Sequence, residues 1–435
     1  MRYTFCSFAH LKRMILFMLL ALLLCGGALA ENGLTIDENG VITDYTGTAA
    51  ELIIPDMIDG VAVTAIGEGA FDFCSDLESV FIPAGVTSIG DYAFFDCEKL
   101  KDVTGAEGVT SIGQSAFDGC TNLMEINLSE GLTFIGSLAF YNCRKLGSII
   151  LPDTVTAIEN NAFGNCTSLT NVALPVGIVS INSHTFGGCT SLAGVNIPEG
   201  VTTIDNSAFK NCSSLTSITI PESVTFIGSS AFHGCSSLTS IVIPGGVTAI
   251  EESTFENCTS LTDVVIPEGV TSIGMAAFYN SANKDDARIF LPETLTTVGT
   301  AAFMHSGFNE VHVSSLWKWL KIEAVAELSH VTLYIEGERL ELPAALKAID
   351  DAAFTGISAR IVVIPNGCTA IGACAFTNNS DLQAVFMPDS VIAIAADAFE
   401  GCDSVVFVCD SDNFAAEYAQ AHGIPYILLS IMSVE

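Results

Sequence analysis

The sequence predicts a solenoid, in which short coils of equal length stack one upon the next. Three regularities indicate this architecture. A phenylalanine recurs every 23 residues from Phe71 to Phe278, an isoleucine lies five residues before each of them, and a cysteine lies three residues after all but the last. Repetition at a fixed period between about 20 and 50 residues is typical of solenoids, in which each unit buries its apolar face only against its neighbours.

One unit reads Leu-x-x-Ile-x-Ile-Pro-x-x-Val-x-x-Ile-x-x-x-Ala-Phe-x-x-Cys, as in residues 215–235. Leu-x-x-Ile-x-Ile is β-branched with period-two character, so it predicts a short strand that proline ends. Val-x-x-Ile predicts a second extended segment, and Ala-Phe-x-x-Cys a tight turn or single helical turn. Equivalent side chains of successive coils then stack about 4.8 Å apart. We interpret three asparagines in Asn-Cys-Ser/Thr sequons as turn residues without a glycan, because they share one repeat position: Asn165, Asn211 and Asn257.

The repeats define the domain organisation. Residues 66–278 hold the regular 23-residue units, residues 279–354 hold irregular units with an insert that contains Trp317 and Trp319, and residues 355–404 resume the pattern. The two tryptophans, the only ones in the chain, either fill the irregular core or anchor a binding partner.

Both ends of a solenoid expose strand edges and an open core, so each end needs a cap. Residues 31–65 alternate like strands around an Asn39-Gly40 hairpin turn, and we expect them to close the front. Residues 405–435 are expected to close the back with a strand, a helix that Ser411 caps and Gly423 ends, and a final extended edge.

Residues 1–30 have the features of a secretory signal peptide. Three basic residues precede an unbroken apolar run, and residues 28–30 offer a small-x-small cleavage site. We therefore expect cleavage after Ala30 and a mature protein that is secreted or held at the cell surface. The alternative is a lipoprotein signal with Cys25 as the lipidated residue.

Acidic residues outnumber basic ones by 49 to 15, which gives a formal net charge of −34. A surface this negative repels phosphate backbones and anionic lipid, so we predict no nucleic-acid binding and no binding to membrane surfaces. Beyond the signal region no run of about 18 uncharged apolar residues occurs, which predicts no transmembrane segment in the mature chain. We expect a monomer, with the charge keeping a half-apolar chain soluble.

The recurring cysteines predict a column of single thiols. Successive members of a parallel ladder keep their Cβ atoms about 4.8 Å apart, whereas a disulfide needs about 3.8 Å. Later repeats place Ser281, Ser306 and Asn379 at the cysteine position, so small hydrogen-bonding side chains interchange with the thiol. This pattern favours buried groups that satisfy backbone carbonyls or amides over disulfides, metal binding or redox chemistry. We expect no metal and no cofactor.

The repeated unit resembles the bacterial leucine-rich repeat of the BspA-like surface-antigen family, also called the Treponema-type repeat. The likeness covers nearly all of residues 31–435, and the segments at 59–61 and 415–419 and the Trp-containing insert are also similar to features of that family. The resemblance implies a leucine-rich repeat fold in a secreted or surface-attached protein. It also implies binding to host matrix proteins or to other cells.

The outward positions of Leu-x-x-Ile-x-Ile are free of the core, which makes them candidates for protein recognition. Between the two isoleucines the chain places several apolar residues that the core does not need: Phe81, Ile150, Val242, Val265, Phe290 and Phe386. With Trp317 and Trp319 they form the predicted protein-binding set, an apolar surface for an extracellular host-matrix or cell-surface protein. The competing interpretation is that β-branched and aromatic residues merely favour strands.

Two other functions are compatible with a solenoid. A carbohydrate-cleaving enzyme would need paired carboxylates in a cleft, but the pairs at 251–252 and 285–286 are adjacent in sequence and would face opposite ways in a strand. His184 and His233 are isolated substitutions without a serine elbow, phosphate loop or metal motif nearby. We therefore predict no enzyme activity. A passive structural spacer is the remaining alternative.

Overall fold

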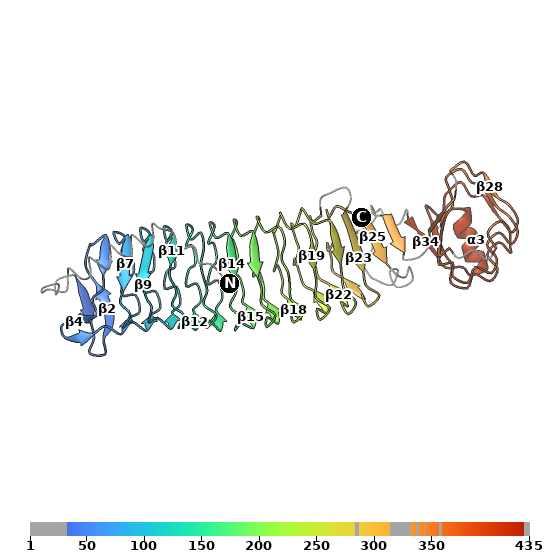
Figure 1. Cartoon of the computed structure of the whole chain (residues 1–435). Helices are drawn as coiled ribbons and strands as arrows, with labels where there is room; N and C mark the ends of the chain where they lie inside the picture. Colours follow the sequence, from blue (N-terminus) through green and yellow to red (C-terminus); the bar gives the residue numbers. More distant parts are fainter. Residues whose placement is uncertain are drawn as a thin grey trace, which may run out of the picture. The chain divides into compact units, whose positions relative to one another are not determined.

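The computed structural model describes residues 33–282, 287–313, 332–335, 339–342, 344–355 and 359–429. The predicted signal peptide, the acidic pair at 285–286 and the tryptophans Trp317 and Trp319 lie outside these residues. The predicted solenoid is confirmed, with about 15 turns of about 23 residues and parallel strand ladders (Figure 1). Two compact units are described separately: unit 1 holds the described residues up to Val201 with Ser207–Leu215, and unit 2 holds the remainder.

Unit 1 contains two parallel ladders (Figure 1). The longer strands follow Leu-x-x-Ile-x-Ile: β3 (Glu51–Ile53), β7 (Ser79–Ile82), β9 (Asp102–Gly105), β11 (Glu125–Ile126), β14 (Asn171–Ala173) and β16 (Gly194–Asn196). The two-residue strands follow Val-x-x-Ile: β6 (Ala65–Ile66), β8 (Ser88–Ile89), β10 (Ser111–Ile112), β12 (Phe134–Ile135), β13 (Ala157–Ile158) and β15 (Ser180–Ile181). Ile66 pairs with Ile89 and Ile89 with Ile112, so equivalent repeat positions stack as predicted.

Unit 2 repeats the arrangement with two sheets of longer strands. The first contains β19 (Ile241–Val242), β21 (Asp263–Val265), β23 (Ala287–Leu291), β25 (Phe308–Val313) and β26 (Thr332–Ile335). The second contains β27 (Arg339–Glu341), β29 (Ile361–Val363), β31 (Ala384–Met387), β33 (Val406–Cys409) and β34 (Tyr426–Leu428). The short strands are β17 (Thr203–Ile204), β18 (Phe226–Ile227), β20 (Ala249–Ile250), β22 (Ser272–Ile273), β24 (Thr297–Val298), β28 (Ala348–Ile349), β30 (Ala370–Ile371) and β32 (Ala393–Ile394).

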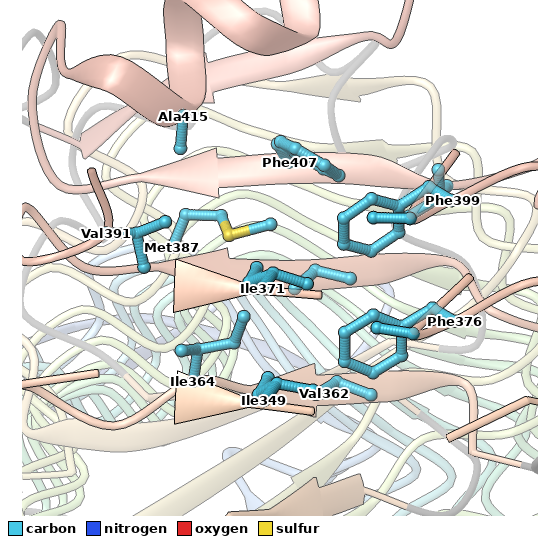
Figure 2. Close-up of a cluster of buried hydrophobic side chains, with 14 of the residues drawn as sticks. Ile349, Val362, Ile364, Ile371, Phe376, Met387, Val391, Phe399, Phe407 and Ala415 are labelled. Atoms are coloured by element: carbon cyan, nitrogen blue, oxygen red, sulfur yellow. The ribbon is translucent and has the colours of Figure 1, made fainter. Parts of the chain in front are cut away.

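The core is a set of columns, each built from one repeat position. Phe94 and Phe117 stack with ring centroids 5.2 Å apart and planes 4° from parallel, and Phe140 and Phe163 stack at 5.4 Å and 2°. These four rings are fully buried. Burial of each large apolar side chain contributes roughly 1.5 to 3 kcal/mol, and neighbouring coils supply the apolar contacts. Figure 2 shows the same columns near the end of unit 2, where Ile349 and Ile371 lie beside Phe376 and Phe399.

Each coil turns at the Ala-Phe-x-x-Cys segment, which is a tight turn as predicted. The backbone N–H of Cys166 donates to the carbonyl oxygen of Phe163 at 3.3 Å, which closes the turn. The residue before the cysteine has a positive φ, a conformation that asparagine and glycine tolerate best. The three sequon asparagines have φ of 58° to 60°, which confirms that they are turn residues: Asn165, Asn211 and Asn257.

The first coil is closed by an antiparallel hairpin. Strand β1 (Leu34–Ile36) pairs with β2 (Val41–Tyr45) through the turn predicted at Asn39-Gly40. Strand β2 then pairs in parallel with β6 and starts the short-strand ladder. The ring of Tyr45 lies 5.2 Å from that of Phe71, so a tyrosine covers the first phenylalanine of the column. A second hairpin joins β4 (Met57–Ile58) to β5 (Val61–Ala62).

The last coil is covered by helix α3 (Phe414–His422), which ends at Gly423 as predicted. The predicted cap, Ser411, is wrong: the side chain of Asn413 accepts the N–H of Ala416, while Ser411 donates to a carboxylate oxygen of Asp389. Strand β34 pairs in parallel with β33 as the final edge. Within the described residues, no helix is both long and apolar enough to span a membrane.

Candidate functional site

The thiol column is an internal hydrogen-bond ladder. Among the described residues, eight cysteines donate their S–H to the carbonyl oxygen of the core phenylalanine 26 residues earlier, in the previous coil. The Sγ–O distances run from 2.9 to 3.2 Å for Cys97, Cys120, Cys143, Cys166, Cys189, Cys212, Cys258 and Cys402. These thiols are buried and free of disulfides. The prediction of buried groups that satisfy backbone carbonyls is therefore confirmed.

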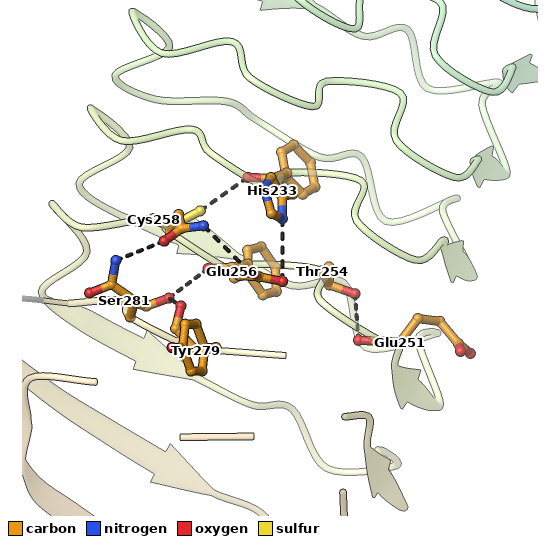
Figure 3. Close-up of polar contacts among 11 residues, drawn as sticks. His233, Glu251, Thr254, Glu256, Cys258, Tyr279 and Ser281 are labelled. Atoms are coloured by element: carbon orange, nitrogen blue, oxygen red, sulfur yellow. Dashed lines mark hydrogen bonds and ion pairs between the residues drawn. The ribbon is translucent and has the colours of Figure 1, made fainter. Parts of the chain in front are cut away.

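Two residues that replace cysteine in this column make the equivalent hydrogen bond to a phenylalanine carbonyl oxygen. The hydroxyl of Ser281 donates to the carbonyl oxygen of Phe255 at 2.6 Å, and the amide of Asn379 donates to that of Phe354 at 2.7 Å. Figure 3 shows Cys258 and Ser281 in successive turns, each with its hydrogen bond. Burial raises the pKa of the Cys189 thiol to about 12, so the thiolate needed for nucleophilic or metal chemistry is disfavoured.

The outward face of unit 2 brings three predicted binding residues together. Val242 pairs with Val265 across β19 and β21, Val265 with Phe290 across β21 and β23, and Phe290 with His312 across β23 and β25. Val242 is 72% exposed and Val265 is 57% exposed. The half-buried rings of Phe290 and His312 stack at 4.3 Å and 25°. We call these four residues the outer row.

A row of charged residues lies on the same strands, two residues before the outer row and on the same outward side. Asp263 pairs in register with Arg288, and Arg288 with Glu310. The guanidinium of Arg288 binds Asp263 at 2.7 Å, and this hydrogen bond lowers the pKa of the Asp263 carboxyl. An ion pair thus borders the exposed valines. The face therefore combines an apolar strip with fixed charges of both signs, a composition that suits protein recognition.

Three other predicted binding residues lie outside the sheet that carries the outer row, and the two tryptophans lie outside the described residues. In unit 1, Phe81 is half-buried, whereas Ile150 is 79% exposed, and the polar residues Thr104 and Asn127 occupy the intervening coils. Phe386 is half-buried on β31, in the second sheet of unit 2. Among the described members of the predicted set, Val242, Val265 and Phe290 are thus the ones that share one sheet. The predicted set did not include His312, because only apolar residues were selected. Its repeat position, which is that of Phe290, could have identified it.

The residues weighed for catalysis have structural partners in the turns. His233 Nδ1 lies 3.4 Å from Glu256 Oε2, and both side chains are 21% exposed (Figure 3). The Nδ1 atom of His184 lies 3.0 Å from the hydroxyl oxygen of Ser183, and the backbone of His184 is left-handed. In the part of the chain that the structure describes, no group of three or more His, Cys, Asp and Glu residues could hold a metal ion.

The sequence matches the family model of the BspA type leucine rich repeat region. The match comprises six copies and covers residues 51–170, 156–285, 249–336 and 335–415. The chain belongs to the BspA-type leucine-rich repeat family. The resemblance carried by the repeated unit is thereby confirmed. Membership makes this BspA-type chain a repeat protein of a class whose members generally lack catalytic activity.

Several solved structures are similar to this BspA-type protein. A leucine-rich repeat protein from Bacteroides ovatus shares 23% identity, and the match covers 92% of this chain and 100% of that chain with a TM-score of 0.56. A leucine-rich cell surface protein from Faecalibacterium prausnitzii shares 24% identity, with 92% and 95% covered and a TM-score of 0.43. The T. pallidum leucine-rich repeat protein shares 31% identity, with 49% and 91% covered and a TM-score of 0.39. No curated protein matches the sequence. The Bacteroides ovatus structure supports the solenoid fold.

Proposed function

We propose that this BspA-type protein is a secreted or cell-surface recognition scaffold without catalytic activity, and that it adheres to a host-matrix or neighbouring-cell protein through the outer row. The observation that carries the proposal is the side-by-side exposure of Val242 and Val265 on adjacent strands. Neither side chain packs in the core, so burial inside the fold does not account for these two valines. A partner that covers them removes apolar surface from water.

The rest of the outer row supports a protein partner. The stacked rings of Phe290 and His312 extend the apolar strip by two strands, and aromatic side chains often contribute most to protein–protein binding energy. The neighbouring Asp263–Arg288 pair offers hydrogen-bonding groups at the border, where a protein interface is usually polar. The parallel ladder holds all these positions at fixed spacing, which lowers the entropy lost on binding.

The proposal is tested with the mature protein and a panel of purified fibronectin, laminin and collagen by surface plasmon resonance. The double variant Val242→Ser with Val265→Ser removes exposed atoms only, so we expect an unchanged circular dichroism spectrum. Loss of these contacts should weaken binding by at least about tenfold. Ile150→Ser is the matched control, because Ile150 is 79% exposed at the same repeat position of unit 1.

Two outcomes would contradict the proposal. Equal affinity of the double variant and the unmodified protein for a bound panel member would remove the outer row as the site. A flat response to every panel member, together with labelling of the protein on intact cells, would favour a structural spacer. Hydrolysis of a polysaccharide by the purified protein would instead favour the enzyme alternative.

A further inference from the structure

Two turn positions in unit 1 carry aromatic residues whose backbone is left-handed. Phe73 has φ of 53° and Tyr92 has φ of 55°. A bulky side chain is strongly disfavoured at positive φ, because its Cβ crowds the backbone. Most other coils place small or polar residues at the same repeat positions, such as Gly119, Asn142 and Asn165 for Phe73 and Ser115, Asn161 and Ser207 for Tyr92, although Leu138 with φ of 59° also lies in the Tyr92 column. The two aromatics therefore carry local backbone strain, as Leu138 does, and their exposure and their neighbours decide whether they have a function.

Both side chains lie on the surface and form a cluster with Phe95. Phe73 is 63% exposed and Tyr92 is 36% exposed, while Phe95 is half-buried. The ring of Phe95 lies 5.4 Å from that of Phe73 and 5.8 Å from that of Tyr92, with interplanar angles of 82° and 75°. We call these three residues the aromatic cluster. Its nearly perpendicular rings leave ring faces open to solvent.

The cluster is held in place before any ligand arrives. The N–H of Phe73 donates to the carbonyl oxygen of Phe95 at 2.8 Å, and the N–H of Phe95 donates to that of Tyr92 at 3.0 Å. The hydroxyl of Tyr92 accepts the side-chain amide of Gln114 at 2.8 Å. A rigid aromatic surface loses little conformational entropy on binding.

Carboxylates surround the aromatic cluster. Asp72 and Asp118 occupy the Phe95 position in the preceding and following coils, and Asp96 occupies the Phe73 position in the next coil. The N–H of Asp96 donates to the carbonyl oxygen of Asp118 at 2.7 Å. Burial, followed by the charge of Asp96, raises the pKa of Asp118 to about 6. Aromatic and acidic residues thus alternate on this surface.

The lysines of these coils are bound elsewhere. Lys99 binds Asp76 at 2.9 Å, and Lys101 binds Glu78 at 2.6 Å. Among the residues that the structure describes, no ion pair involves Asp72, Asp96 or Asp118. The carboxylates beside the rings therefore favour an external cation, and the net charge of the chain attracts one over a longer range.

We propose that the aromatic cluster and its carboxylates bind a basic peptide segment of a partner protein, with a lysine or arginine side chain held against the ring faces by cation–π contact and neutralised by the aspartates. Ring faces attract cations within about 6 Å of the centroid, and arginine and lysine are the cations that proteins supply. A neutral glycan could stack on the rings but would leave the carboxylates without a counter-ion, so the acidic surround favours the basic peptide. The site lies on the turns of unit 1 and is independent of the outer row.

The test uses fluorescence anisotropy with a fluorescein-labelled Gly-Lys-Gly-Lys-Gly peptide at about 0.15 M salt, where long-range attraction is largely screened. The double variant Phe73→Asn with Tyr92→Ser restores residues that other coils use and leaves the charge unchanged. We expect it to weaken binding by at least about fivefold, the effect of losing cation–π contacts. We also expect a higher thermal midpoint, because the left-handed strain is relieved. Phe134→Ser is the matched control, because it removes a 38% exposed phenylalanine elsewhere in unit 1.

Three further results decide the proposal. Asp96→Asn with Asp118→Asn should also weaken peptide binding and should reduce its salt dependence. Equal peptide affinity of the unmodified protein and the double aromatic variant would overturn the proposal, and a lower thermal midpoint of that variant would then assign the rings to the fold. Binding of cellohexaose that the aromatic variant abolishes, without affinity for the lysine peptide, would overturn it in favour of a glycan site.

Discussion

The thiol of Cys166 donates to the carbonyl oxygen of Phe140 in the previous coil, over an Sγ–O distance of 3.2 Å. The same oxygen accepts the backbone N–H of Cys143, also at 3.2 Å. Both acceptor positions of a buried carbonyl are thus filled by the cysteine column. The cysteine column therefore joins successive coils through side-chain hydrogen bonds at the turns.

Replacing one thiol tests this role. Cys166→Ala should lower the free energy of unfolding by about 1 to 2 kcal/mol, because a donor and a buried sulfur are both lost. Cys166→Ser should lower it less, since a hydroxyl at this position keeps the bond, as Ser281 does at 2.6 Å. Urea unfolding followed by circular dichroism measures both changes, and Ser281→Ala is the control for an equivalent loss. Equal stability of the alanine and serine variants would contradict the hydrogen-bonded role.

Thiol reactivity should follow burial. Burial raises the pKa of Cys143 and Cys166 well above the ordinary thiol value. The pKa of Cys74 is also raised, by a hydrogen bond with Cys97, and that of Cys374 by one with Asp397, so these two thiols differ from the buried ones in being partly exposed. We expect iodoacetamide to modify Cys74 and Cys374 in the folded protein and the buried cysteines only after unfolding. Mass spectrometry of digested protein identifies the modified sites. A lower thermal midpoint after addition of a reducing agent would point to disulfides instead.

The pH dependence of stability should carry a contribution from Asp118. Its folded-state pKa of about 6 exceeds the ordinary value of about 4 for an unfolded aspartate, so the folded state binds the proton more tightly. This contribution therefore favours folding below about pH 4 and is lost as the pH rises through about 6. Asp118→Asn should raise stability at pH 7 by about 1 kcal/mol after allowance for solvent screening, and should change it little at pH 4. Thermal melts at both pH values measure this, with exposed Asp72→Asn as control. A lower thermal midpoint for Asp118→Asn at pH 7 would contradict the prediction.

The sequence predicted the ladder well because every core position is repeated. Fourteen copies of one unit leave little freedom once a phenylalanine, an isoleucine and a cysteine recur together, and stacking follows from the common period. The role of the thiols was also predictable, because Ser281 and Asn379 share only hydrogen-bonding capacity with cysteine. The repeat period and the residues that replace cysteine can both be read directly from the amino-acid sequence.

The surface was predicted less well, because exposure depends on neighbours in other coils. Val265 is exposed, whereas Phe290 is half-buried at the same repeat position because its ring lies on His312. Selecting apolar residues by repeat position also missed Phe73 and Tyr92, whose signal was different. Phe73 interrupts a column of small or polar turn residues, and Tyr92 lies in a column whose other members, apart from Leu138, are small or polar.

The cap of helix α3 shows the same limit and gives a final test. Ser411 and Asn413 are both good capping residues two positions apart, and sequence alone does not reveal that Asp389 accepts hydrogen bonds from both. Asn413→Ala should lower the free energy of unfolding by about 1 kcal/mol, because Asn413 also accepts the N–H of Ala416 at 3.1 Å. Ser411→Ala should have a smaller effect, and Asn413→Asp should keep the cap. Urea unfolding of the three variants ranks them, and a larger loss for Ser411→Ala than for Asn413→Ala would return the cap to Ser411.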